Sequence, residues 1–282
     1  MAVPKPAREG GTDRFDTRPI DGLFQFQYQP VDQIETLQSA IQALSAPIDS
    51  YLEDHILSAE FHAVAHGATK EQIGHIAIHG GSLLTQFYLQ PWARRWGQSL
   101  YREIIRRLGL TAALVPTCDE FFLSHALDDY VDLHKQAYFF VTGAPVAPWD
   151  DMPGLHFRQA TMTDHAATAA LNDGFIDKLE ERIARGEIHI GALDGAVVAL
   201  GIRERGRLLP DCASIGMLVA QAHRQQGIGT RMIRYLRSVC EGQGLQPLAG
   251  CAYDNPLSKR TLEAAGMVTT TQLLRISYIQ PA

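Results

Sequence analysis

Long apolar runs are missing from this 282-residue chain, and no segment approaches the roughly 20 apolar residues needed to cross a bilayer. A basic excess is missing too: 25 Lys and Arg face 31 Asp and Glu, giving a formal charge of −6. A general nucleic-acid binder usually carries a basic face. We therefore expect no membrane span and no nucleic-acid partner, and the mild acidity favours a cationic small molecule.

Cysteine is scarce, and its four copies show no C-x-x-C pair or framework spacing. They are Cys118, Cys212, Cys240 and Cys251. This scatter predicts buried thiols in a reducing compartment. Residues 1–15 contain prolines, glycines and charges but no apolar segment typical of a signal peptide. We expect this segment to be a flexible tail and the protein to be cytoplasmic.

The composition is typical of a soluble globular protein, with 46% hydrophobic and 20% charged residues. Its length predicts about two domains. The clearest break is the segment 141–154, VTGAPVAPWDDMPG, whose prolines and glycines can continue neither a helix nor a central strand. We predict a first domain at 16–141, a linker at 142–154 and a second domain at 155–282.

The second half alternates strand-like and helix-like segments, including an Asp194-Gly195 link that is a strong hairpin signal. Strands are predicted at 155–160, 188–193, 196–203, 213–219, 245–252 and 271–279, and helices at 166–172, 175–185, 228–239 and 257–265. The first half repeats this order with a period near 130 residues. The pattern predicts an α/β fold with a mixed sheet, built from two similar units in tandem.

A glycine-containing loop, Arg224-Gln-Gln-Gly227-Ile-Gly229-Thr230, joins a predicted strand to a predicted helix. The glycines permit positive φ and close approach of a ligand to the backbone. Amides at a helix N-terminus carry a partial positive charge, so the loop is suited to a pyrophosphate. No Gly-Lys-Ser/Thr sequence follows, and the third glycine of a dinucleotide-binding fingerprint is missing.

Three motifs together resemble the GCN5-related N-acetyltransferase (GNAT) family over most of residues 155–280. They are Arg224-x-x-Gly227-x-Gly229, the segment 155–164 with Arg158 and Asp164, and Asn255-x-x-Ser258 followed by Gly266-Met267. The resemblance implies an acyl-CoA N-acyltransferase-like fold whose central strands part, with acetyl-CoA as cosubstrate and no metal. The residues that it assigns to acetyl-CoA are Met217, Leu218, Val219, Arg224, Gln225, Gln226, Gly227, Ile228, Gly229, Thr230, Asn255 and Ser258.

Two positions that often carry catalytic groups in this family depart from its pattern. The tyrosine expected seven residues after Asn255 is Leu262, and the glutamate expected before Val219 is replaced by Ser214 or Ile215. Asp211 is the nearest carboxylate that can substitute as a base, although a solvated aspartate near pKa 4 is a poor base unless burial raises its pKa. Our catalytic candidates are Asp211 and Tyr253, with His223 as a weaker one.

The first half keeps only traces of the phosphate loop, in the segment 91–99, PWARRWGQS. Matching Arg94 to Arg224 pairs Gly97 with Gly227, whereas matching the apolar faces of the helices pairs Gly97 with Gly229. The second alignment is favoured because a buried stripe fixes helix register. One glycine is lost in either case, and the Asn-x-x-Ser motif is absent. We predict a degenerate copy that binds no pyrophosphate.

Four histidines, His62, His66, His75 and His79, lie on two predicted strands of the first half. Cross-strand pairs His62/His79 and His66/His75 would face each other if the strands were antiparallel in that register. No carboxylate or cysteine completes either pair to the three or four ligands that zinc prefers. We expect polar strand histidines and no metal.

The motifs favour an N-acetyltransferase that transfers an acetyl group from acetyl-CoA to a primary amine of a small molecule or peptide by direct attack. A non-enzymatic acyl-CoA-binding or regulatory module is the alternative, supported by the missing Glu and Tyr. A protein that binds ATP or NAD through the glycine loop is a third reading. The tandem copies are compatible with a monomer or a homodimer.

Overall fold

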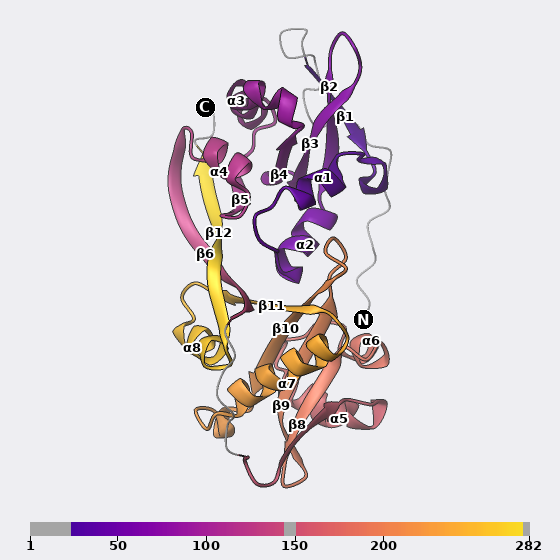
Figure 1. Ribbon diagram of the computed structural model, residues 1–282, viewed down its shortest axis with the longest axis vertical. Coiled ribbons are helices and arrows are strands. Elements are labelled where there is room, and N and C mark those ends of the chain that lie inside the picture. The colour runs from indigo at the N-terminus through magenta and orange to yellow at the C-terminus, as the bar shows by residue number, and fades with distance from the viewer. Residues whose placement is uncertain (1–23, 144–150, 279–282) are drawn as a thin grey trace.

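The computed structural model of this chain describes residues 24–143 and 151–278. A single twelve-stranded sheet spans both halves in the order β1-β2-β3-β4-β5-β12-β6-β11-β10-β9-β8-β7 (Figure 1). The order is symmetric about the β12–β6 pair, with the other strands of the first half on one side and those of the second half on the other. The α/β fold class and the internal repeat predicted from the sequence are therefore confirmed.

The strands are β1 (Phe24–Gln29), β2 (Glu60–His66), β3 (Gln72–His79), β4 (Leu83–Leu89), β5 (Ala112–Pro116), β6 (Tyr130–Thr142), β7 (Leu155–Gln159), β8 (Ile188–Leu193), β9 (Ala196–Arg205), β10 (Cys212–Val219), β11 (Gln246–Ala252) and β12 (Met267–Tyr278). The α-helices are α1 (Leu37–Gln42), α2 (Ser50–Leu57), α3 (Gly97–Arg107), α4 (Glu120–Ala126), α5 (His165–Asn172), α6 (Leu179–Ala184), α7 (Ile228–Gly242) and α8 (Pro256–Ala264). Short 3-10 helices precede α1 (η1, Val31–Gln33), α3 (η2, Pro91–Trp96), α5 (η3, Met162–Asp164) and α7 (η4, Gln221–His223). None of the helices in the described ranges has the length and apolar character of a membrane span.

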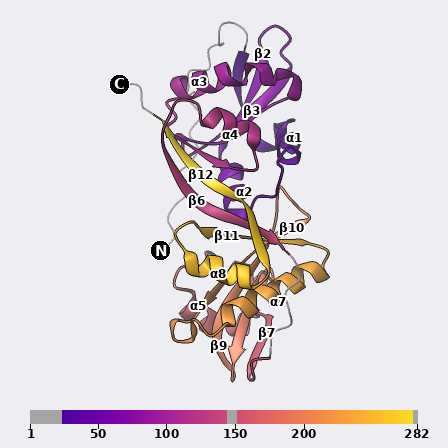
Figure 2. The ribbon, with the colours of Figure 1, turned by 60° about the vertical axis from the view of Figure 1, so that its left-hand side comes forward.

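The two longest strands, β6 and β12, join the halves. They pair antiparallel with each other, while β6 also pairs with β11 of the second half and β12 with β5 of the first (Figures 1 and 2). Each strand thus completes the sheet of the half to which it does not belong in sequence. The domain ranges 16–141 and 155–282 stay a prediction. The predicted tail 1–15 and most of the predicted linker 142–154 lie outside the described residues.

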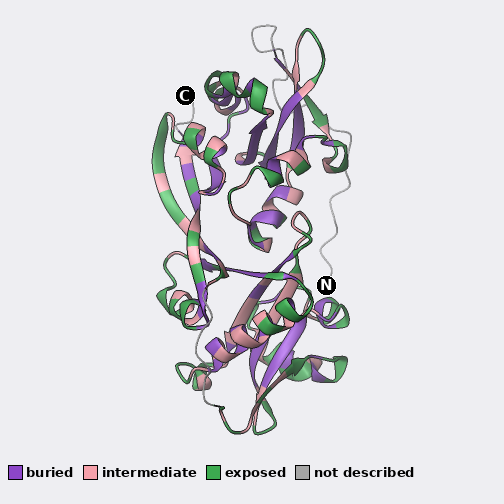
Figure 3. Ribbon diagram, viewed as in Figure 1, coloured by how far each residue is buried: buried purple, intermediate pink, exposed green. Residues whose placement is uncertain are grey.

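Helices cover both faces of the sheet, and the residues beneath them are buried (Figure 3). In the second half, one core packs under α7, with Met232, Ile233 and Leu236 fully buried, and another gathers Ile183 of α6 with Ile190 of β8. The exchanged strands enter the cores as well. Phe140 of β6 packs in the core under α7, and Leu274, Ile276 and Tyr278 of β12 pack in the first half.

The parallel strands β10 and β11 stay together for only three residue pairs, ending at Ser214 and Leu248. Beyond this point β10 continues along β9, and β11 continues along β6. We call this divergence the splay. A backbone that leaves its ladder keeps polar groups that need other partners. The same event occurs in the first half, where β4 and β5 share two parallel pairs ending at Leu84 and Ala113.

Helix α2 of the first half packs against the second half. The buried Glu53 carboxylate accepts hydrogen bonds from three successive backbone N–H groups of the β9–β10 loop: Arg207 at 2.9 Å, Leu208 at 3.2 Å and Leu209 at 3.1 Å. At the start of the helix, the Ser50 N–H donates to Ser214 Oγ at 2.8 Å. An exposed ion pair between Arg207 and Asp54 adds to this contact. The position of α2 against the second half is therefore fixed at several points.

The histidine strands do not pair in the register that would bring the predicted pairs together. His62 lies opposite Ile76, and His75 lies opposite Ala63. His75 instead sits in the core, where its Nδ1 is 2.7 Å from Thr36 Oγ1 and its Nε2 is 2.9 Å from Gln86 Oε1. Within residues 24–143 and 151–278, no group of three or more potential metal ligands is found.

Burial of His75 predicts a pH-dependent stability. Desolvation lowers the pKa of His75 to about 4, whereas an unfolded histidine has a pKa near 6.5. Between these values the unfolded chain binds more protons, so folding is disfavoured as the pH falls. We expect the wild type to lose about 2 kcal/mol between pH 7.5 and 5 relative to a His75→Asn variant, measured by urea unfolding. The solvent-exposed His156, replaced in the same way, is the control; identical pH profiles for wild type and His75→Asn would contradict the prediction.

Candidate active site

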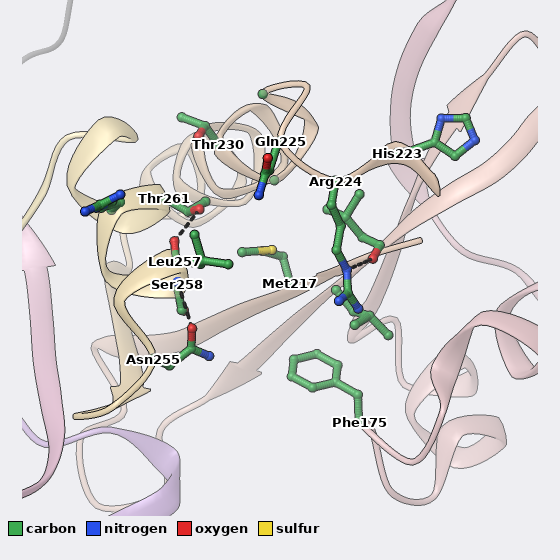
Figure 4. A pocket seen from close by; sticks show the side chains of 15 residues that line it. Phe175, Met217, His223, Arg224, Gln225, Thr230, Asn255, Leu257, Ser258 and Thr261 are labelled. Atoms are coloured by element: carbon green, nitrogen blue, oxygen red, sulfur yellow. Dashed lines mark hydrogen bonds between the residues drawn. The ribbon is translucent and has the colours of Figure 1, made fainter. Parts of the chain in front are cut away.

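The site is built where β10 ends and α7 begins. After Val219 the chain forms the short helix η4 and then the loop Arg224–Gly227. The Arg224 Nε donates to the Val219 carbonyl at 3.1 Å, which ties the loop back to the end of the strand (Figure 4). This bond leaves the rest of the guanidinium beside the splay.

Two residues of this loop have left-handed backbone conformations. Gln225 has φ +62° and Gly227, which precedes the first residue of α7, has φ +79°. At Gly227 the absence of a side chain relieves the strain that such a φ imposes on other residues. The backbone N–H groups that follow Gly227 form the N-terminus of α7, a helix of 15 residues. The positive end of the helix dipole therefore points into the loop. This combination is chemically suited to an anion.

Helix α8 forms the opposite wall. Asn255 precedes the helix, and its side-chain oxygen accepts a hydrogen bond from the Ser258 N–H at 3.0 Å (Figure 4). One turn later Thr261 donates to the Leu257 carbonyl at 2.8 Å, with its methyl group near Gly229. A Cβ at Gly229 would lie 3.2 Å from Met217 Sδ and 3.4 Å from Thr261 Cγ2. Glycine therefore keeps the two helices and the strand close.

A cavity of about 550 Å³ lies between these elements, within the size range of small-molecule sites. The residues that line it are Phe175, Met217, Leu218, Val219, His223, Arg224, Gln225, Gly227, Gly229, Thr230, Asn255, Leu257, Ser258, Arg260 and Thr261. Two arginines are among them, and none of these residues is Asp or Glu. The lining therefore suits an anionic ligand with an extended, partly apolar arm.

Most of the residues that the sequence assigned to acetyl-CoA line this one cavity. The exceptions are Gln226, whose side chain turns to the Ala222 carbonyl, and Ile228, which is buried in the core. Sequence reasoning missed Phe175, Leu257, Arg260 and Thr261. Leu257 and Thr261 lie two and six residues after Asn255, so the helix period after that motif was an available signal. Phe175 lies in the connection between α5 and α6, and no sequence pattern marked it as a cavity residue.

A bidentate ion pair holds the start of the second half in place. Arg158 donates to both carboxylate oxygens of Asp164 at 2.7 Å, and Asp164 also caps the turn by accepting from the Thr161 N–H at 2.9 Å. These bonds hold the pKa of Asp164 well below its usual range, chiefly through Arg158. The pair positions the beginning of α5 rather than the cavity.

The two catalytic candidates from the sequence lie outside the cavity lining. Asp211 is exposed at the beginning of β10, about 20 Å along the strand from Met217. Tyr253 stacks on Tyr138 with ring centroids 4.9 Å apart, and its hydroxyl accepts from Lys135 Nζ at 2.9 Å. The Lys135 hydrogen bond is the main reason why the pKa of Tyr253 is lowered. Leu262 and Ile215 pack in the core, and Ser214 faces α2.

The counterpart loop in the first half keeps the arginine and loses two residues. Arg94 Nε lies 3.4 Å from the Leu89 carbonyl, the same contact that Arg224 makes with Val219. Gly97 begins α3 and packs against α4, as Gly229 packs against α8. Both alignments considered from the sequence are therefore partly right: the arginines correspond, the helix glycines correspond, and the loop between them is shorter.

Bulky side chains of α4 pack against the counterpart of the phosphate loop. A Cβ at Gly97 would lie 2.4 Å from His125 Nε2 and 3.0 Å from Phe121 Cζ. Phe121 stacks on Phe87 at 5.3 Å between centroids, and the Arg94 guanidinium lies 5.0 Å above Phe121. Aromatic rings of α4 thus pack against the first half's counterpart of the phosphate loop, and its arginine covers a ring.

Each half of the chain matches a model of a known protein family. Residues 31–143 match the "Acetyltransferase (GNAT) domain" family, and residues 154–267 match the "Acetyltransferase (GNAT) family". The chain belongs to the GNAT acetyltransferase family. It is a tandem of two GNAT domains, and its membership supports an acyl-transfer function. No curated protein matches the chain.

Solved structures show the same tandem GNAT fold along nearly the whole chain. An acetyltransferase from the GNAT family of Colwellia psychrerythraea superposes with a TM-score of 0.80 at 17% identity, over 91% of this chain and 99% of that one. A GCN5-related N-acetyltransferase from Sphaerobacter thermophilus gives 0.62 at 15% identity, over 96% and 98%. A tandem GNAT protein from the clavulanic acid biosynthesis pathway gives 0.58 at 16% identity, over 92% and 99%. These likenesses concern the fold.

Proposed function

We propose that this tandem GNAT protein transfers an acetyl group from acetyl-CoA to a primary amine of a small molecule or peptide by direct attack. The observation that carries the proposal is the junction of the β10–β11 splay with the left-handed loop at the start of α7. An extended arm with amide groups fits the unpaired strand edges, and a pyrophosphate fits the helix start. When bound, acetyl-CoA supplies a thioester carbonyl open to attack by an amine.

Each wall of the cavity has a role in this proposal. Backbone groups of Met217, Leu218 and Val219 bind the pantetheine arm, and the amides and side chains from Arg224 to Thr230 bind the pyrophosphate. Asn255 and Ser258 border the cofactor on the α8 side. The acceptor amine reaches the splay from the face of the sheet covered by α5 and α6, where Phe175 of their connection contributes to the cavity.

Calorimetric titration with acetyl-CoA tests the cofactor part of the proposal. We expect one binding site per chain, because the first half's loop is two residues shorter and Phe121 and His125 of α4 pack against it. Thiol release in the presence of a panel of primary amines then tests the reaction. Two sites per chain would contradict the degenerate first copy, and no binding would contradict the proposed function.

The alternative function is an acyl-CoA-binding or regulatory module without turnover. It is supported by the absence of Asp and Glu from the described residues that line the cavity, and by Leu262 and Ser214 at positions that often carry catalytic groups. Binding of acetyl-CoA without thiol release on any amine would favour it. Competition by ATP would instead favour a nucleotide-binding protein.

A further inference from the structure

The acceptor side of the splay receives a carboxylate from the other half of the molecule. We propose that Asp49, at the start of α2 in the first half, is the general base for acetyl transfer in the second half. This inference rests on the proposed function. It assigns to the first half, whose own counterpart of the phosphate loop is shortened, a direct part in the chemistry of the second.

The Asp49 carboxylate caps α2 and contacts strand β11 at the same time. Its Oδ1 accepts from the Leu52 N–H at 3.2 Å, as expected of an aspartate that precedes a helix. Its Oδ2 lies over Gly250, so closely that a Cβ there would be 2.1 Å from this oxygen. Gly250 thus admits the carboxylate to the surface of β11, two residues beyond the last residue that pairs with β10.

The carboxylate lies on the acceptor face of the sheet. Ala249 and Cys251 pack in the core under α7, so Gly250 between them faces the opposite side. The next residue of α2, Ser50, donates from its backbone N–H to Ser214 on β10. Ser214 is the last residue of β10 that pairs with β11 before the splay.

One step further along the same face of β10 is Gly216, about 7 Å from Ser214. A Cβ there would lie 3.7 Å from Phe175 Cζ, and Phe175 lines the cavity. Asp49 and the cavity therefore border the same splay from adjacent positions.

Burial gives Asp49 the proton affinity of a useful base. Its side chain is 7% exposed, and desolvation, with a smaller contribution from the Glu53 charge, raises its pKa to about 6. Glu53, one turn further along α2, is the charged group that acts on it. Elsewhere along α2, Asp54 pairs with Arg207, and the Cys212 thiol at the start of β10 has its pKa raised by burial and by the Glu53 charge. Strand β11 presents Gly250 to it. A base with a pKa near 6 is ionised at neutral pH and still accepts a proton readily.

The proposed step balances without another reactant. The nitrogen–carbon bond forms as the amine attacks the thioester carbonyl, and the carbon–sulfur bond breaks with its electron pair leaving on the CoA thiolate. The surplus proton of the amine passes to the Asp49 carboxylate, directly or through one water. Solvent then takes this proton and protonates the thiolate, which restores the enzyme.

The test uses Asp49→Asn in the full chain, because an asparagine oxygen still caps the helix. We expect kcat/KM with an amine substrate to fall about 100-fold or more, while the Kd for acetyl-CoA changes less than about two-fold. The wild-type kcat/KM should rise with pH through about 6, and the variant should lose this limb. Hydrolysis of bound acetyl-CoA, followed as thiol release without an amine, should fall in parallel.

Two further variants distinguish the base from a helix cap. Asp119→Asn removes another capping carboxylate whose pKa burial raises to about 6, but in the first half at α4, and should leave kcat/KM unchanged. Asp211→Asn tests the base predicted from the sequence. Full activity of Asp49→Asn, or a loss confined to Asp211→Asn, would overturn the proposal while leaving the acetyltransferase function standing.

One outcome concerns the proposed function itself. A wild type that binds acetyl-CoA and releases no thiol, with or without amines, would overturn both inferences.

The raised pKa of Asp49 can also be tested without turnover, from the free energy of unfolding between pH 4 and 6. This free energy should fall with rising pH in the wild type relative to Asp49→Asn, because the folded state holds the Asp49 proton more tightly. A constant difference would show that Asp49 lacks the raised pKa that the base role requires.

Discussion

Replacing Gly227 with glutamate is expected to raise the Kd for acetyl-CoA at least about 100-fold, equivalent to about 2.7 kcal/mol. Gly227 has φ +79°, a conformation that costs a residue with a side chain about 1–2 kcal/mol. The new carboxylate would also stand at the positive end of α7, in the place proposed for a pyrophosphate. Calorimetric titration measures the change directly.

A matched control for this variant exists at the other end of α7. Gly244 also has a left-handed conformation, with φ +70°, and a Cβ there would meet nothing within 4 Å. Gly244→Glu imposes the same kind of backbone strain and the same charge far from the cavity. Its affinity should match that of the wild type. Equal weakening by both substitutions would assign the effect to general destabilisation, and no weakening at Gly227 would remove the loop from the cofactor site.

Replacing Glu53 with alanine is expected to lower the free energy of unfolding by about 2–4 kcal/mol. The carboxylate is 2% exposed and accepts from three backbone N–H groups of the β9–β10 loop. A fully buried, unsatisfied donor costs about 1–3 kcal/mol. The three donors here are only part-buried, so water reaches them in part when the carboxylate is removed and the total loss is smaller than three full penalties. Chemical denaturation followed by circular dichroism measures the loss.

The neighbouring Asp54 offers the comparison. It pairs with Arg207 of the same loop, but both side chains are more than half exposed. An exposed ion pair of this kind contributes about 0.2–1 kcal/mol. Asp54→Ala should therefore destabilise far less than Glu53→Ala. Similar losses for the two variants would mean that the loop contact depends on surface charge rather than on the buried carboxylate.

Local patterns predicted much of the second half. The Asp194-Gly195 link does join β8 to β9, and both residues have positive φ, as such a two-residue turn requires. The predicted phosphate loop lies between a strand and a helix, and its residues gather around one cavity with Asn255 and Ser258. These features depend on residues close in sequence, where glycine, caps and apolar spacing act directly.

Features that depend on segments far apart in the sequence could not be predicted from local patterns. The exchange of β6 and β12 joins strands more than 100 residues apart, and their alternation gives no sign of which neighbour each will take. The register that separates His62 from His79 belongs to the β2–β3 pair, whose irregularity between Val64 and Ala65 no residue pattern announced. The contact between Asp49 and Gly250 spans both halves, so no motif marks it. Sequence reasoning looked for catalytic groups near the motif residues in the second half and named Asp211, Tyr253 and, as a weaker candidate, His223.

The exchange of β6 and β12 between the halves gives a reason why the degenerate first half is retained in the chain. A gene that dropped the first half would also drop β6, leaving β11 as an unprotected edge and removing Phe140 from the core under α7. An open edge of this kind invites aggregation. The cavity of the second half therefore depends on a first half whose own phosphate loop is shortened, and such a tandem can diverge in function without ever being shortened to a single unit.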